Sequence, residues 1–320
     1  YGAEKHAAAL ASEINTSYFQ VASGIRERNE FVRGYATRMG TLPMHARTHP
    51  PVWPLVFRAA LDAGTHPQGE RVARFTAWAL GADWNASDTL AASAAERVLA
   101  RSDVAGLWLV VALLAMCVLA LPAAAYFLAR AFAAPEVALF AAAWCGLLPA
   151  PLLFFPNVDV AHPVLYALAI GAWLRRERHV AWALITGVLA AVLVALSFGN
   201  LGLYLACAAL VLLGANGGPV RARHEGVCAM LLLLPLAVLA VWADRIGARP
   251  LALYSEGIRQ HHLILAHRTR WLWLFLNPLE TAVALGMPTV FWLAFHVDLG
   301  TLGRALRRAT LAGGELLLAS

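Results

Sequence analysis

Charge is scarce in this 320-residue chain. Only 14% of its residues are Asp, Glu, Lys or Arg, whereas soluble globular proteins carry about 25%. Hydrophobic residues make up 60% of the chain, and the mean hydropathy is +0.64. This composition excludes an ordinary soluble domain and indicates an integral membrane protein.

The usual signatures of cofactor and hydrolase sites are also missing. The sequence contains no Walker loop, no GxGxxG fingerprint, no HExxH pair and no GxSxG elbow. Its four cysteines all fall inside apolar runs, which favours small buried side chains over a disulfide or metal framework. The net charge of +6 requires no nucleic acid, because arginines facing anionic lipid account for it. We therefore expect no metal site and no nucleic-acid partner.

Apolar runs dominate the chain from about residue 104 onward. A run of roughly 20 apolar residues is enough to cross a hydrocarbon core about 30 Å thick. Seven runs are present, at about 105–129, 136–155, 158–174, 180–198, 200–215, 226–243 and 271–296. They predict an all-α polytopic transmembrane helix bundle over residues 104–320, after an external, mostly helical segment over residues 1–103. Because the chain begins without Met and ends in what resembles the opening of an eighth span, we expect a fragment lacking both termini.

The loops between the runs alternate between two chemistries. One set is rich in arginine and comprises Arg130, Arg175, Arg176, Arg178, Arg221, Arg223, Arg304, Arg307 and Arg308. The opposite short loops, at residues 156–159 and 198–200, contain no Lys or Arg. By the positive-inside rule the arginine side is cytoplasmic, where it anchors the protein to anionic lipid. We therefore expect a multi-pass protein of the cell (inner) membrane, with residues 1–103 and the long 244–270 loop on the external or periplasmic side.

Two acidic residues stand at or inside apolar runs, where a carboxylate is costly unless it is hydrated or paired. Asp159 begins the third run and has His162 three residues later, on the same helical face. Glu280 lies inside the last run, three residues after Asn277. A functional role is the hypothesis for both. The alternative is that Asp159 caps its helix and pairs with His162, and that Glu280 makes an interhelical hydrogen bond. The His261–His262 pair has no companion ligand at metal spacing and is interpreted as part of a surface loop.

A set of short motifs resembles one enzyme family. The segment HARTHPP at residues 45–51, followed by an apolar helix, resembles the THPPG or HPPL element in the first external loop of GT-C superfamily glycosyltransferases. Further similar pieces follow in order, at residues 126–130, 155–159 and 273–288. Val52 replaces the glycine that often follows the prolines, and the family's first transmembrane helix is absent from this sequence. The acid that such enzymes carry just after that helix therefore has no assigned position.

The resemblance implies transfer of a sugar from a polyprenyl-phosphate donor, in a dolichyl-phosphate-mannose mannosyltransferase-like reaction. The acceptor would be an envelope glycan, lipid or protein at the external face, with membrane lipid as the other partner. Such transfer needs a carboxylate for the acceptor or the developing oxocarbenium charge, and cationic or hydrogen-bonding groups for the leaving phosphate. We assign the catalytic role to Glu13, Asp159 and Glu280, and substrate binding to His45, Arg47, His49, His162, Asn200 and Asn277. A divalent metal ion stays an open alternative as cofactor, since members of this superfamily differ in metal dependence.

Simpler interpretations compete with several of these roles. Glu13 is equally explained as a solvated helix charge, and the histidines around Arg47 as caps and anchors of their loop. A transporter or flippase for a lipid-linked or anionic substrate would also use Asp159 and Glu280, but it should show internal repeats, and none is evident. A third alternative is a noncatalytic membrane scaffold, in which acids within apolar runs, such as Asp159 and Glu280, would have no function.

Overall fold

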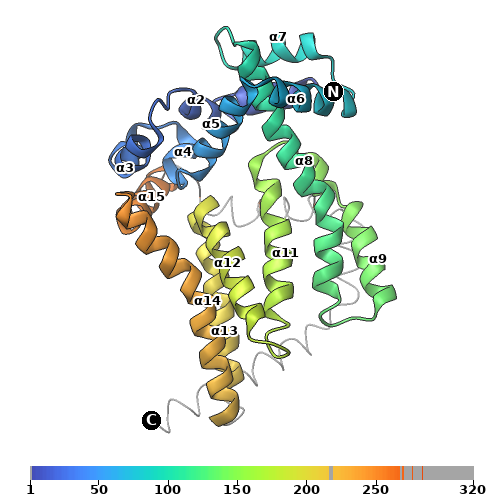
Figure 1. The fold of residues 1–320 in the computed structure, drawn as a ribbon, viewed down its shortest axis with the longest axis vertical. Helices are drawn as coiled ribbons and strands as arrows, with labels where there is room; N and C mark the ends of the chain where they lie inside the picture. Colours follow the sequence, from blue (N-terminus) through green and yellow to red (C-terminus); the bar gives the residue numbers. More distant parts are fainter. Residues whose placement is uncertain (1, 216–218, 267–268, 270–275, 277–282, 284–320) are drawn as a thin grey trace.

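The computed structural model describes residues 2–215 and 219–266, together with the single residues 269, 276 and 283. Throughout these residues the secondary structure is helical and contains no strand, which confirms the predicted all-α class. Figure 1 shows a layer of short helices across one end of a set of longer helices. We call the first part, α1 to α7, the N-terminal layer, and the second part, α8 to α14, the bundle.

The N-terminal layer consists of short helices, as the sequence predicted for residues 1–103. They are α1 (Lys5–Ala11), α2 (Tyr18–Ser23), α3 (Arg28–Arg38), the 3-10 turn η1 (Met39–Thr41), α4 (Met44–Thr48), α5 (Val52–Gly64), α6 (Pro67–Ala79) and α7 (Trp84–Ala94). Local signals fix their ends: Pro67 opens α6, and the Asp83 carboxylate caps α7 by accepting from the Ala86 N–H. Trp53, Phe57 and Leu61 recur at helical spacing along α5 and form its buried face.

Six of the seven predicted apolar runs form helices in the described residues. They are α8 (Arg101–Ala129), α9 (Pro135–Gly146) with α10 (Pro149–Leu153), η2 (Val158–Val160) with α11 (Ala161–Trp173), α12 (Ala181–Leu196), η3 (Phe198–Leu201) with α13 (Gly202–Ala215), and α14 (Pro219–Arg245). The second run is divided because Pro149 begins a new helix within it. The seventh run, 271–296, lies outside the described residues.

Three segments are long and apolar enough to cross a membrane: Arg101–Ala129, Pro135–Leu153 and Pro219–Arg245. The other three apolar helices are shorter, 10 to 17 residues each. At a rise of 1.5 Å per residue the 16 residues of α12 cover about 24 Å, less than a hydrocarbon core of about 30 Å. Membrane association is therefore indicated, whereas a count of seven spans is not established by these helices.

Helix α8 joins the two parts of the molecule. Its first half is buried among the helices of the N-terminal layer through Val104, Leu107, Trp108 and Val111. A Cβ on Gly106 would lie 2.8 Å from the Leu61 Cα, so this glycine allows α5 to pack directly on α8. The core thus continues across the boundary that the sequence placed between residues 103 and 104.

The connections of the bundle gather at two opposite ends (Figure 1). At the layer end lie η2, η3 and α15 (Pro250–Leu265), which contacts α3, η1 and α4. At the arginine end lie the α8–α9 and α11–α12 connections and the beginning of α14. This separation matches the predicted alternation of loops. One expectation was wrong: residues 250–265, predicted as part of a long loop, form a helix because Leu253, Gly257 and Gln260 are buried at helical spacing.

Candidate functional site

A pocket of about 360 Å³ opens at the layer end, between α4, η3 and α15. Its polar lining comes from Thr48, His49, Ser197, Tyr254, His261 and His262. Helix α15 can approach η3 closely because Gly257 has no Cβ. A Cβ at this position would lie 2.7 Å from the Phe198 ring. The pocket therefore joins the N-terminal layer to two distant parts of the chain, and three of its side chains are imidazoles.

His49 is held in a defined orientation and tautomer. Pro50 follows it, which favours the extended backbone observed at His49 (φ −118°, ψ 157°). The Nδ1 atom lies 2.9 Å from the His45 carbonyl oxygen and 3.0 Å from the Thr48 hydroxyl. A carbonyl only accepts, so Nδ1 carries the proton and Nε2 of the neutral ring is an acceptor. Nε2 is thus the atom that can take a proton from a bound hydroxyl.

Two buried tyrosines hold the segment that carries His49. The Tyr35 hydroxyl donates to the carbonyl pair of Ala46 (2.7 Å) and His49 (3.3 Å). The Tyr18 ring meets the His49 ring edge-on, with centroids 6.3 Å apart. Burial raises the pKa of both phenols above their ordinary value, so each stays a hydrogen-bond donor at neutral pH.

Asp159 and His162 form the pair that the structural alternative for Asp159 expected. The Asn157 side chain accepts from the Asp159 N–H at 3.1 Å, which fixes the start of η2. The Asp159 carboxylate lies 3.5 Å from His162 Nδ1 and is 63% exposed. His162 Nε2 is buried, and no partner for it exists among the described residues. A solvent-accessible carboxylate therefore stands at the layer end beside a histidine with one unused nitrogen.

The electrostatics place Asp159 and His49 in one neighbourhood. Burial lowers the pKa of His49, while its hydrogen bond to the His45 carbonyl and the negative charge of Asp159 act in the opposite direction. The positive forms of His45 and His162 would lower it further. His49 is consequently a neutral imidazole at pH 7, and the negative charge of Asp159 favours its protonated form.

The other predicted site residues have varied surroundings. Arg47 and His45 lie half-buried on α4, and Arg47 Nε donates to the Leu42 carbonyl at 2.9 Å. Asn200 is buried: its amide donates to the Leu193 carbonyl (2.6 Å) and accepts from the Tyr166 hydroxyl (2.8 Å). These contacts give Asn200 a structural role between α11, α12 and η3.

Three predicted residues lie apart from the pocket or beyond the description. Glu13 is exposed in the connection between α1 and α2 and does not line the pocket. Asn277 and Glu280 lie outside the described residues. The sequence missed Tyr254, His261 and His262 as pocket residues, because the segment that carries them was interpreted as a loop.

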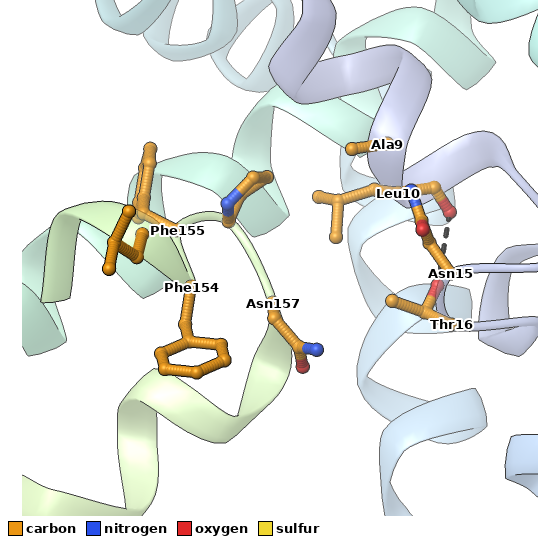
Figure 2. A pocket seen from close by; sticks show the side chains of 9 residues that line it. Ala9, Leu10, Asn15, Thr16, Phe154, Phe155 and Asn157 are labelled. Carbon is orange, nitrogen blue, oxygen red and sulfur yellow. Dashed lines mark hydrogen bonds between the residues drawn. The ribbon is translucent and has the colours of Figure 1, made fainter. Parts of the chain in front are cut away.

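A second, smaller cavity of about 210 Å³ lies between the α1–α2 connection and the loop after α10 (Figure 2). Leu10, Asn15 and Thr16 stand on one side, and Phe154 and Asn157 on the other. The Thr16 hydroxyl is already bonded to the Leu10 carbonyl at 3.3 Å. No titratable side chain lines this cavity, so it offers no group for acid–base chemistry.

The arginine end contradicts one expectation from the sequence. Arg175 and Arg176 were predicted to face lipid, but only 9% and 7% of their surfaces are exposed. Arg176 binds the Glu225 carboxylate through Nε and Nη2, each at 3.1 Å, and Glu225 is fully buried. The sequence missed Glu225 because its partner lies 49 residues away. Arg176 is therefore paired inside the bundle instead of facing lipid.

No protein-family model, curated protein or solved structure matches the chain. Among the described residues, no group of three His, Cys, Asp or Glu side chains is placed to hold a metal ion.

Proposed function

We propose that this protein is a membrane glycosyltransferase of the GT-C type. It transfers a sugar from a polyprenyl-phosphate donor to an envelope glycan, lipid or protein acceptor at the layer end, on the external side of the cell membrane. The observation that supports the proposal is the pocket of about 360 Å³ lined by His49, His261 and His262, at the same end of the bundle as the exposed Asp159 carboxylate, whose charge acts on His49.

The chemistry of the pocket suits the two halves of such a transfer. Asp159, or His49 Nε2, removes the proton from the acceptor hydroxyl, whose oxygen then bonds to the anomeric carbon of the sugar. The bond from that carbon to the phosphate oxygen breaks, and the phosphate leaves with the electron pair. Arg47, His261 and His262 are the cationic or hydrogen-bonding groups available for the leaving phosphate.

An apolar groove beside the pocket supports a lipid-linked substrate. The groove, about 350 Å³, runs between α12 and α14 and is lined by residues that include Val188, Ala195, Pro235 and Trp242. Helix α12 leads directly into Ser197 and η3, which line the polar pocket. A polyprenyl chain in the groove would therefore hold its phosphate near the imidazoles.

The direct test is a transfer assay with labelled polyprenyl-phosphate sugars and the purified protein in lipid. We expect Asp159→Asn and His49→Gln to reduce kcat about 100-fold or more, the usual contribution of a general base. Asp88→Asn is the matched control, since Asp88 is an exposed aspartate of α7 away from the pocket lining. Absence of transfer with every donor, together with movement of the lipid across sealed vesicles, would favour a transporter or flippase instead.

A further inference from the structure

Two consecutive arginines at the arginine end differ in their partners: a carboxylate neutralises one of them, and carbonyl oxygens bind the other. Arg175 and Arg176 follow α11, and both are buried. Arg176 has an internal counter-ion, because Glu225 accepts two hydrogen bonds from its guanidinium. Within the described part of the chain, Arg175 bonds to neutral groups: Nη1 donates to the Gly171 carbonyl (2.6 Å) and Nη2 to the Phe127 carbonyl (2.7 Å). Its guanidinium also lies 3.9 Å from the centre of the Phe127 ring.

The surroundings of Arg175 add positive charge. Arg130 follows Phe127 by three residues at the end of α8, and its guanidinium donates to the Ala133 carbonyl. Burial lowers the pKa of Arg175, and the charges of Arg178 and Arg130 lower it further. The geometry agrees: Arg175 bonds to Phe127, three residues before Arg130, and the Arg178 N–H donates to the Arg175 carbonyl at 2.9 Å, so the three arginines lie on adjoining turns.

The nearby acids do not neutralise this group. Glu177, next along the chain, pairs with Arg221 at 3.2 Å. Glu136, at the start of α9, is exposed and forms no ion pair within the described part of the chain. A buried cation is costly without a counter-ion. An anion from outside these residues would therefore stabilise the charge of Arg175.

We propose that Arg130, Arg175 and Arg178 form a binding site for a phosphate-bearing anion, with the phosphate of an anionic membrane lipid as its source. Guanidinium groups match phosphate oxygens through paired N–H donors, and several arginines together outbind a single one. The site lies where α8 and α11 end, which is the height of lipid headgroups for helices that cross a membrane (Figure 1). It is separate from the proposed transferase pocket at the opposite end of the bundle, so either can fail without the other.

Native mass spectrometry of the detergent-purified protein tests the site with phosphatidylglycerol, phosphatidylcholine and inorganic phosphate as probes. We expect phosphatidylglycerol to bind more tightly than phosphatidylcholine. Arg178→Gln should weaken that binding about fivefold, and the Arg130→Gln/Arg178→Gln pair on the order of 25-fold. Arg221→Gln is the matched control, because Arg221 is an exposed arginine at the same end that already has Glu177 as partner.

The outcomes separate the two sources of phosphate. Tight binding of phosphatidylglycerol that inorganic phosphate does not displace assigns the site to a lipid headgroup. Displacement by inorganic phosphate, lost in the Arg130→Gln/Arg178→Gln variant, assigns it to a soluble anion. Equal binding of both lipids, or equal loss with Arg221→Gln and Arg178→Gln, overturns the proposal. Because Arg178 is exposed, its variant also keeps the test independent of folding.

Discussion

The buried ion pair between Arg176 and Glu225 provides a quantitative test of the bundle. Only 8% of the Arg176 side chain and 1% of the Glu225 side chain are exposed. Replacing Glu225 by Gln removes the negative charge at nearly constant volume and leaves the guanidinium buried without a counter-ion. Breaking one side of such a pair costs about 3–5 kcal/mol, so the free energy of unfolding should fall by about that amount.

The reversal of this effect is the stronger part of the prediction. A double variant, Arg176→Met with Glu225→Leu, removes both charges and fills the same space with apolar groups. Replacing a whole buried pair in this way is often neutral or stabilising, so the double variant should recover most of the loss. With the single variants Arg176→Met and Glu225→Leu the double variant completes a double-mutant cycle, whose non-additivity measures the interaction between the side chains.

Unfolding in mixed micelles of increasing SDS content, followed by tryptophan fluorescence, is a suitable assay. Trp173 is a local probe, because the Arg176 guanidinium lies 4.4 Å from its ring centre. Arg221→Gln serves as a surface control, since the exposed Arg221–Glu177 pair should contribute at most about 1 kcal/mol. The reasoning is refuted if Glu225→Gln changes stability by no more than this control, or if the double variant is as unstable as the single one.

Three further predictions concern the N-terminal layer. Because burial sets the pKa of His49 below the 6.5 of the unfolded chain, the unfolded state binds more protons between the two values. The unfolding free energy should thus rise with pH across that window and fall as pH drops through it. Unfolding of wild type and of His49→Gln over a series of pH values checks this. The same slope of unfolding free energy against pH in both proteins would contradict it. Tyr35→Phe leaves the Ala46 and His49 carbonyls without their donor and should cost about 1–2 kcal/mol by the same unfolding assay, so no change would argue against that hydrogen bond. Gly106→Ala places a methyl group 2.8 Å from the Leu61 Cα and should cost about 1–3 kcal/mol by overpacking, whereas a neutral result would mean that α5 and α8 are not in contact there.

Much of the fold could be predicted because its signals are local. Apolar runs indicated six of the described helical segments, and the contact between Asp159 and His162 agrees with the structural alternative that their spacing suggested. Helices α10 and α15 each begin with a proline. These starts could not be predicted from proline alone, because proline also occurs inside α8 and α14. The described arginine-rich connections, those after α8 and α11 and at the start of α14, likewise lie at one end, as their alternation required, whereas Arg304, Arg307 and Arg308 lie outside the described residues.

The features that the sequence did not predict depend on distant partners. Arg175 and Arg176 are the same residue type at adjacent positions, and only tertiary packing gives Glu225 to one and carbonyl oxygens to the other. Helix α15 carries charges and histidines at a density typical of a loop, and its buried face exists because η1, η3 and α4 cover it. His261 and His262 line the same pocket as His49 only because of that packing.

The measurement that tests the central claim most directly is the rate of sugar transfer from a labelled polyprenyl-phosphate donor by wild type and by Asp159→Asn. We expect wild type and Asp88→Asn to form product. We expect Asp159→Asn to transfer sugar about 100-fold or more slowly at unchanged stability. Equal transfer by all three proteins would contradict the assignment of Asp159, and no transfer by any of them would contradict the proposed function.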